Sequence, residues 1–235
     1  MEGSSVSLVS GSAGAIGKPN GIRPDNTIIF LMDDRTARPE RRAKVADLII
    51  KAAQDGAKAI IIDAYYLKAS NYDSSLEKAF NVAKNKGVKI IIAAGPNGEK
   101  PVFKESENVR VGHIVAQTDG NDNPPNPNYF HPLFKGYTAI PWIIAQRFPQ
   151  CNNPADIPLQ QKITYKDLKG PEAISYNDYK TTDMRGKFVF VGGSINPDSG
   201  NRADQVTTDQ GKITHGVYDL FSASVAYSEY LCGPK

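Results

Sequence analysis

Residues 27–95 contain three short apolar runs that alternate with two amphipathic stretches. The runs are "TIIFLM", "AKAIIID" and "VKIIIAAG", and helical spacing of apolar residues is found in "RRAKVADLIIKAAQDG" and "SSLEKAFNVAKNKG". Strands that alternate with helices of this length form βαβ units, whose strands pair in parallel. Because the runs are continuously apolar, we expect helices to cover both faces of the sheet. The second helix has Ser74 three residues before Glu77, the spacing of a capping box.

The second half of the chain is less regular. "VRVGHIVA" predicts a fourth strand, "GKFVFVGGS" a further buried strand, and "TAIPWIIAQRF" and "GVYDLFSASVAYSEYLCG" two more helices. Residues 118–132 are rich in Pro, Asn, Asp and Gly, which predicts a long loop outside any ladder. Residues 156–180 alternate weakly and predict two short strands or extended connections. We therefore expect an α/β fold, a mainly parallel sheet flanked by helices on both faces, with irregular insertions in the second half.

The chain of 235 residues is long enough for one large domain or two small ones. We expect residues 24–233 to form a single domain, and the Ser- and Gly-rich residues 1–23 to be a flexible leader. The 28 basic and 25 acidic residues are spread without runs, which argues against nucleic acid or anionic lipid as a partner. The apolar runs are much shorter than the roughly 18 residues of a membrane span, so we expect this chain not to cross a bilayer.

The stretch "MDDRT" places two carboxylates directly after the first predicted strand. Phosphatases of the haloacid dehalogenase type need a second carboxylate two positions after the first, where this chain has Arg35. Response-regulator receivers place a phosphoacceptor aspartate after a later strand, and Asp63 comes too early for that role. Neither phosphotransfer chemistry is predicted, and the sequence indicates no cofactor.

The position of the acidic residues is more informative than their spacing. In open α/β sheets, ligands bind beyond the carboxyl ends of the strands. Asp33, Asp34, Asp63 and Ser194 all follow or end predicted strands. The alternative is that these aspartates cap the following turns by accepting bonds from backbone N–H groups. The sequence leaves both interpretations open.

The order of several motifs resembles that of a CHASE2 domain, an extracytoplasmic sensory module. The motifs are "PDNTIIFLMDDRT", "LIIKAAQDGAKAIIIDAYY", "MRGKFVFVGGS", "ADQVTT" and "THGVYDLFSASVAYSEYL". They span the chain from Pro24 to about Leu231. Each motif is weak by itself, and it is their order that is specific.

This resemblance implies a ligand-sensing domain without catalysis, located in the periplasm as part of an inner-membrane receptor. Such receptors carry flanking membrane helices and a cytoplasmic cyclase, histidine kinase or Ser/Thr kinase. Because no spanning segment is predicted in this chain, it is expected to be an excised ectodomain or a divergent soluble relative. The implied partners are an unknown small molecule and a second copy in a homodimer. Residues 119–132 would serve as a lid. The candidate ligand-binding residues are Asp33, Asp34, Arg35, Asp63, Ser194 and Asp204.

The two cysteines, Cys151 and Cys232, are too few for a disulfide scaffold and lack the spacing of a zinc site. Their number and spacing are compatible with two thiols or with one bridge. A periplasmic location, as the resemblance implies, would permit the bridge.

Two further functions stay open at this point. The first is a metal-dependent phosphatase or related hydrolase that uses Asp33, Asp34 and Asp63, because carboxylates and water suit Mg²⁺. The second is a purely structural module that dimerises a receptor or contacts an envelope partner.

Overall fold

The computed structural model describes residues 21–33, 38–114, 116–118, 127–130, 133–149, 161–162, 171, 173–193, 205–207 and 213–232. A six-stranded sheet lies at the centre of the fold, and each pairing between its neighbouring strands is parallel. From one edge to the other, the strands are β10 (Ala173–Ser175), β1 (Thr27–Met32), β11 (Phe188–Gly193), β2 (Ala59–Tyr65), β3 (Lys89–Ala93) and β4 (Val109–Gly112).

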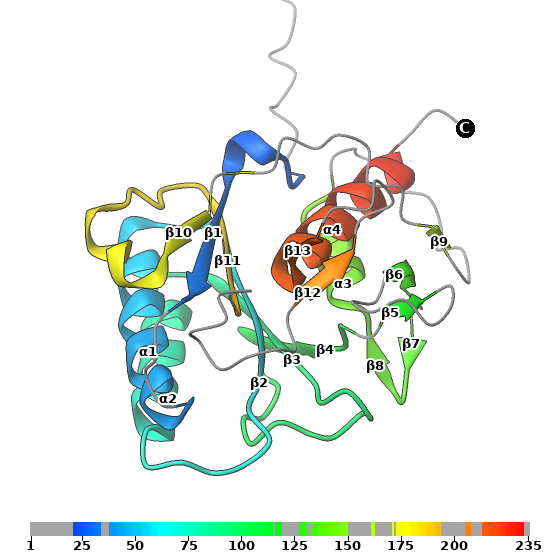
Figure 1. Cartoon of the computed structure of the whole chain (residues 1–235). Helices are drawn as coiled ribbons and strands as arrows, with labels where there is room; N and C mark the ends of the chain where they lie inside the picture. The colour runs from blue at the N-terminus through cyan, green and yellow to red at the C-terminus, as the bar shows by residue number, and fades with distance from the viewer. Residues whose placement is uncertain are drawn as a thin grey trace, which may run out of the picture.

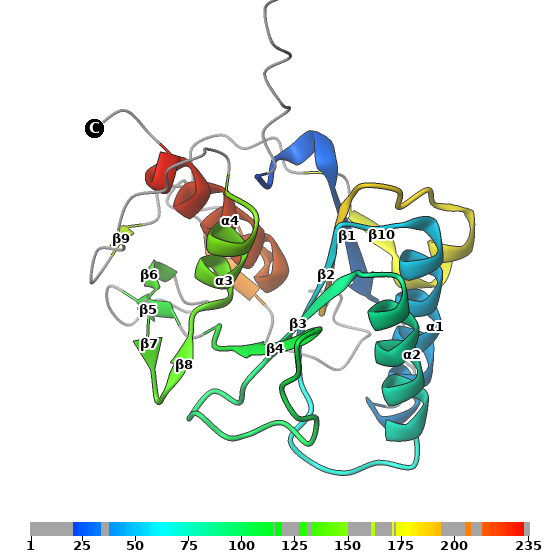
Figure 2. The same cartoon turned by 180° about the vertical axis from the view of Figure 1, so that it is seen from behind.

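Helices cover both faces of this sheet, as Figure 1 and the reverse view in Figure 2 show. One face is covered by α1 (Arg38–Asp55) and α2 (Asp73–Asn85), together with the short helix η2 (Tyr176–Thr181). The other face is covered by α3 (Ile140–Arg147) and α4 (Gly216–Cys232). The result is a three-layer α/β domain, and the prediction of a parallel sheet flanked by helices on both faces is confirmed.

Alternate residues of each strand serve the two layers, because successive side chains of a strand point to opposite faces. On β1, Phe30 packs with the residues of α1 and α2, whereas Ile29 packs with those of α3 and α4. Both residues are fully buried. The apolar run "TIIFLM" is therefore continuous because each of its faces lies against a helical layer.

Additional short strands lie on the α3 and α4 side of the molecule (Figure 1). The strands β5 (Ala116–Thr118), β6 (Pro127–Phe130) and β9 (Gln161–Lys162) form an antiparallel sheet. The strands β7 (Leu133–Phe134) and β8 (Tyr137–Thr138) form a hairpin. The strands β12 (Gln205–Thr207) and β13 (Ile213–His215) form a second two-stranded ladder.

The prediction that residues 118–132 stay outside any ladder was wrong for Thr118, which ends β5, and for residues 127–130. Residues 127–130 form β6, which pairs with β5 on one side and β9 on the other. The reason is the sequence "PNYF": Tyr129 and Phe130 have high strand propensity, and Pro127 stands at the first position of the strand, where its missing N–H is tolerated.

The first and last described elements lie at the same end of the molecule. The short helix η1 (Pro24–Asn26) leads directly into β1 and therefore stands at the amino edge of the sheet. The helix α4 begins near the carboxyl end of β11 and runs back, so that its last turn also approaches the amino edge (Figure 1). None of the helices in the part of the chain that the structure describes is long and apolar enough to span a membrane.

Candidate functional site

Asp33 and Asp63 stand at the carboxyl edge of the sheet, on either side of β11. Asp33 follows the last residue of β1, and Asp63 lies near the end of β2. The strand order β1-β11-β2 separates them by two strand spacings, about 10 Å between the β1 and β2 backbones. The strand between them ends in Gly192 and Gly193, which carry no side chains. The sequence placed both aspartates at this edge, but they do not form one cluster.

Asp33 is bound to the neighbouring edge strand. Its Oδ1 accepts a hydrogen bond of 2.8 Å from the hydroxyl of Ser175, the last residue of β10. The Ser175 oxygen in turn accepts a bond of 3.3 Å from the backbone N–H of Asn177 and so caps η2. Asp33 therefore belongs to a short hydrogen-bonded chain that fixes the start of η2. This is close to the capping role that the sequence left open.

Asp63 faces the α3 and α4 layer. On β2, Ile60 and Ile62 pack with the α1 and α2 layer and Ile61 packs with the opposite layer, so alternation directs Asp63 toward α4. The ladder with β11 is regular up to Ile62, and the ladder with β3 shifts its register between Ile62 and Tyr65. Bulges of this kind re-aim side chains and are common beside functional sites. The irregularity takes Asp63 out of the regular ladder.

Asp219 is the residue at this edge that the sequence did not indicate. It lies in the first turn of α4 and is 5% exposed. Its Oδ1 is buried and has no hydrogen-bond partner within the described part of the chain. Burial, and then the negative charge of Asp63, raise the pKa of the Asp219 carboxyl well above its ordinary value. The partial positive charge of the helix N-terminus acts in the opposite direction.

Gly192 allows α4 to begin this close to the sheet. A Cβ atom at residue 192 would lie 2.5 Å from the Cβ of Val217, a distance that real Cβ atoms essentially never show. The absent side chain lets the first turn of α4 sit against the end of β11. The first turn of α4, which carries Asp219, therefore begins near the carboxyl edge at which Asp63 also stands.

The sequence carried only a weak signal for Asp219. The periodic apolar residues Val217, Leu220 and Phe221 define the buried face of an amphipathic helix, and Asp219 falls outside that set. In the structure α4 is buried on nearly all sides, including the small residues Ala223 and Ser224. A helix that is covered on all sides also buries its polar residues, including Asp219. A single sequence does not show which other elements cover a helix, so this burial was not predictable.

Most of the remaining candidates from the sequence fall outside the described residues, and Cys232 lies away from the carboxyl edge. Asp34, Arg35, Ser194, Asp204 and Cys151 all lie in the undescribed part of the chain, as do residues 119–126 and 131–132 of the predicted lid. Cys232, at the end of α4, is disulfide-bonded. The described residues include no group of three or more His, Cys, Asp and Glu side chains that is arranged to hold a metal ion.

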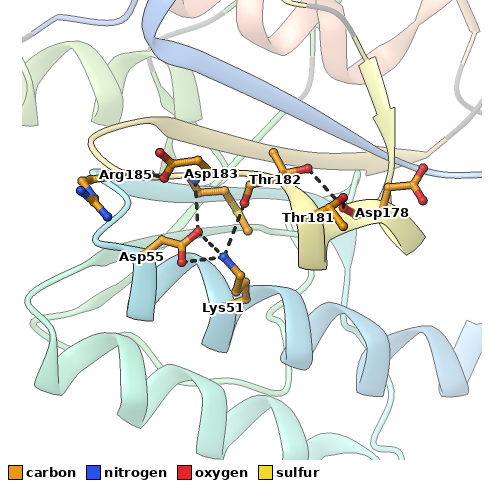
Figure 3. Close-up of polar contacts among 8 residues, drawn as sticks. Lys51, Asp55, Asp178, Thr181, Thr182, Asp183 and Arg185 are labelled. Atoms are coloured by element: carbon orange, nitrogen blue, oxygen red, sulfur yellow. Dashed lines mark hydrogen bonds and ion pairs between the residues drawn. The ribbon is translucent and has the colours of Figure 1, made fainter.

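A second polar cluster lies at the opposite, amino edge of the sheet (Figure 3). Lys51 and Asp55, in the last turns of α1, form an ion pair with 2.6 Å between Nζ and Oδ1. The other carboxylate oxygen of Asp55 accepts a bond of 3.2 Å from the backbone N–H of Met184. Burial acts to raise the pKa of Asp55, but the bonds from Lys51 and Met184 outweigh it and hold the pKa below its ordinary value. These partners are all satisfied, so this cluster is structural: it ties α1 to the segment that leads into β11.

The fold and the site define a three-layer α/β domain with two acidic residues at the carboxyl edge of its sheet, the half-buried Asp63 and the buried Asp219. No protein-family model, curated protein or solved structure matches the chain.

Proposed function

We propose that this chain is the ligand-sensing domain of a bacterial transmembrane receptor, extracytoplasmic and without catalysis of its own. The observation that carries the proposal is the buried carboxyl of Asp219, which has an oxygen without a hydrogen-bond partner in the described structure. Leaving a buried polar group unpaired costs about 1–3 kcal/mol, so such a group in a native fold needs an explanation. A ligand that completes its bonding at the carboxyl edge supplies that explanation.

The arrangement of the described chain ends supports a receptor. The helix η1 and the last turn of α4 approach the same edge of the sheet (Figure 1). Asp63, near the end of β2, and Asp219, in the first turn of α4, lie toward the opposite edge. In a receptor of this kind both ends of the domain would face the membrane, and the ligand site would face away from it. The disulfide at Cys232 fits the oxidising periplasm that such a location provides.

A ligand can transmit a signal here only if it favours one arrangement of the domain, or of its dimer, over another. The helix α4 is suited to this task, because its first turn carries Asp219 and its last turn lies at the opposite edge. A ligand that draws Asp219 and Asp63 closer would shift the first turn of α4, and with it the whole helix. We expect the membrane segments to transmit the displacement of the last turn of α4 to a cytoplasmic cyclase or kinase.

The test is a thermal-shift screen of small molecules on the whole chain, followed by the same screen on Asp63→Asn. We expect compounds that raise the Tm of the unaltered protein to lose their effect in that variant. The matched control is Asp47→Asn, because Asp47 is exposed on the outer side of α1 and should leave the response unchanged. Stabilisation that is equal in all three proteins would contradict a site at this edge.

The same preparations test the two other functions. Hydrolysis of phosphate esters that requires Mg²⁺ and is lost in Asp33→Asn would support the hydrolase in place of the sensor. A purely structural module predicts that an intact receptor still signals when Asp33, Asp34 and Asp63 are all replaced, and a sensor predicts that the response is lost.

A further inference from the structure

Three neighbouring strands of the central sheet begin at a lysine. Lys187 stands directly before β11, Lys58 stands directly before β2, and Lys89 is the first residue of β3. The register pairs Phe188 with Ala59 and Ala59 with Lys89, so these strand starts are aligned across the amino edge. Because neighbouring strands lie about 5 Å apart, the three lysines stand in a row at the start of the sheet.

The segments that lead into the strands carry further basic residues. The amino-edge surface is defined by the residues that lead into β1, β2, β3 and β11, which are 23–26, 51–58, 84–89 and 182–187. Hydrogen bonds join neighbouring segments of this surface. The Gly186 N–H donates to the Gly56 carbonyl over 2.9 Å, and Nζ of Lys187 donates to the Asp25 carbonyl over 2.6 Å. The four segments therefore form one continuous surface.

The amino-edge surface is strongly basic. It contains eight Lys and Arg residues and three Asp residues. This excess of positive charge is larger than the formal charge of +3 for the whole chain, so the rest of the chain is net negative. Two of the acids are paired within the surface, Asp25 with Arg23 at 3.1 Å and Asp55 with Lys51 at 2.6 Å. The basic residues are separate in the sequence, and the parallel fold gathers them at one edge.

Three of the cations are available to a partner. Lys84, Lys86 and Arg185 are exposed, and none of them forms an ion pair with a carboxylate in the part of the chain that the structure describes. The dipole of α2 accounts for Lys84, which lies in the last turn of that helix, but it does not account for Arg185. Cations that are distributed over several segments suit an extended array of negative charges better than one small anion.

We propose that the amino-edge surface contacts the anionic phospholipid headgroups of the membrane that holds the receptor. This inference rests on the proposed function, because it takes both ends of the domain to continue into membrane segments. The helix η1 and the last turn of α4 approach this same edge, so those segments would hold the surface beside the bilayer (Figure 1). Tethering raises the effective concentration of headgroups, and contacts that are weak for the separate domain are then occupied.

The contact also sets the orientation of the domain. The headgroups attract the basic amino edge and repel the remainder of the chain, which is net negative. The carboxyl edge therefore faces away from the bilayer, toward the solution that a ligand comes from.

The test is co-sedimentation of the whole chain with two kinds of vesicle. One contains phosphatidylcholine alone, and the other contains phosphatidylglycerol as well. We expect binding that increases with the fraction of the anionic lipid, and no binding to phosphatidylcholine alone. High salt should abolish the binding, because salt screens the attraction between exposed charges.

Two triple variants of equal charge locate the contact. The first is Lys84→Gln/Lys86→Gln/Arg185→Gln, which should bind anionic vesicles about tenfold or more weakly than the unaltered protein. The second removes the same charge from three exposed lysines outside the amino-edge surface, and it should bind within about twofold of the unaltered protein. Its substitutions are Lys68→Gln, Lys78→Gln and Lys100→Gln.

Acetylation of lysines, followed by mass spectrometry, measures the orientation separately from the affinity. On anionic vesicles Lys84 and Lys86 should react more slowly than in the free protein, whereas Lys68 and Lys100 should react equally fast in both states. Circular dichroism confirms that the variants are folded. If the first variant does not fold, the acetylation pattern of the unaltered protein carries the test.

Equal binding of the two triple variants would overturn the inference, because the overall charge and not the amino edge would then be responsible. Protection of Lys68 and Lys100 in place of Lys84 and Lys86 would also overturn it, as would binding of an oligonucleotide without binding of anionic vesicles. If vesicles do not bind but a small molecule stabilises the protein through Asp63, the sensor function stands without this contact. If vesicles bind through the amino edge but no ligand is found, the contact stands and the sensor function fails.

Discussion

At the scale of single residues, a buried and ionised Asp219 lowers the free energy of unfolding relative to a neutral side chain at the same position. Its pKa is raised by burial and by Asp63, so the folded protein holds this proton more tightly than the unfolded chain does. The contribution is therefore fully favourable below the ordinary pKa of aspartate and is lost as the pH rises through the raised, folded-state pKa. Groups that function in binding often carry such a cost.

We predict that Asp219→Asn changes the pH dependence of stability. The variant lacks this titration, so its free energy of unfolding should increase relative to that of the unaltered protein as the pH rises above about 4. The Tm measured by differential scanning calorimetry from acid to neutral pH tests this, with the Asp47→Asn variant following the unaltered protein. A difference in Tm that stays constant over the whole pH range would contradict the assignment of a raised pKa to Asp219.

Gly192 is the second residue on which the site depends. We predict that Gly192→Ala lowers the free energy of unfolding by about 1–3 kcal/mol, because its Cβ would overlap that of Val217 and push the first turn of α4 away from β11. Amide hydrogen exchange should become faster in α4. The matched control is Gly56→Ala: Gly56 has a φ of +82° and no neighbouring atom within 4 Å of an added Cβ. That change strains one turn and should leave exchange in α4 unaltered, so equal exchange in the two variants would count against the contact.

At the scale of elements, the end of α1 is fixed by the carboxylate of Asp55. We predict that Asp55→Asn lowers the free energy of unfolding at pH 7 by about 1–2 kcal/mol, because the ion pair with Lys51 is lost and the acceptor for the Met184 N–H is weakened. The folded-state pKa is lowered, so this stabilisation is present above the ordinary pKa of aspartate and is lost as the pH falls through the folded-state value.

Urea unfolding at neutral and at acid pH measures this difference. The two proteins should have nearly equal stabilities at the lowest pH at which both still fold. The control is Asp183→Asn in the same connecting segment, where the carboxylate is exposed and, among the residues that the structure describes, accepts a bond only from the nearby Arg185 N–H. A constant difference between Asp55→Asn and the unaltered protein at every pH would show that the carboxylate charge plays no part.

Elements with a long apolar period were predictable from the sequence, and local capping was not. The sequence predicted the buried strand at residues 27–32 and the helices α1 and α4. In each of these elements many apolar residues follow the pattern of one type of secondary structure. The capping box at Ser74 was wrong: Tyr72 is the N-cap of α2 and makes no side-chain cap bond. Asp73 instead forms an ion pair with Arg42 of α1. Arg42 is distant from Asp73 in the sequence, so the local spacing of residues does not reveal this contact at the start of α2.

The candidate site was predictable only as far as strand ends could be located. Asp33 and Asp63 were placed correctly at the carboxyl edge, since that edge follows from the parallel pairing. Their separation by β11 depends on the strand order, which one sequence does not contain. Asp219 depends in addition on the contact between Gly192 and Val217. That contact brings together segments whose proximity is a property of the complete fold.

At the scale of the whole molecule, the disulfide at Cys232 secures the end of α4. We predict that Cys232→Ser lowers the free energy of unfolding by about 2–4 kcal/mol, because a cross-link limits the unfolded chain. Since the sequence contains two cysteines, Cys151→Ser should have the same effect. Urea unfolding of the oxidised and reduced protein tests this: reduction should bring the unaltered protein to the stability of either variant and should leave the variants unchanged. Equal stability of the oxidised and reduced forms would contradict it.

The contact between α3 and α4 contains the single tryptophan of the chain. Trp142 is 1% exposed, and its ring centroid lies 5.1 Å from that of Tyr227 on α4. The intrinsic fluorescence of the protein therefore comes from a buried indole whose surroundings change whenever α4 shifts against α3. Emission wavelength and quenching report on the movement of the helix that carries Asp219, without any label. Stopped-flow mixing can then separate the rate at which a ligand arrives from the rate at which this layer responds.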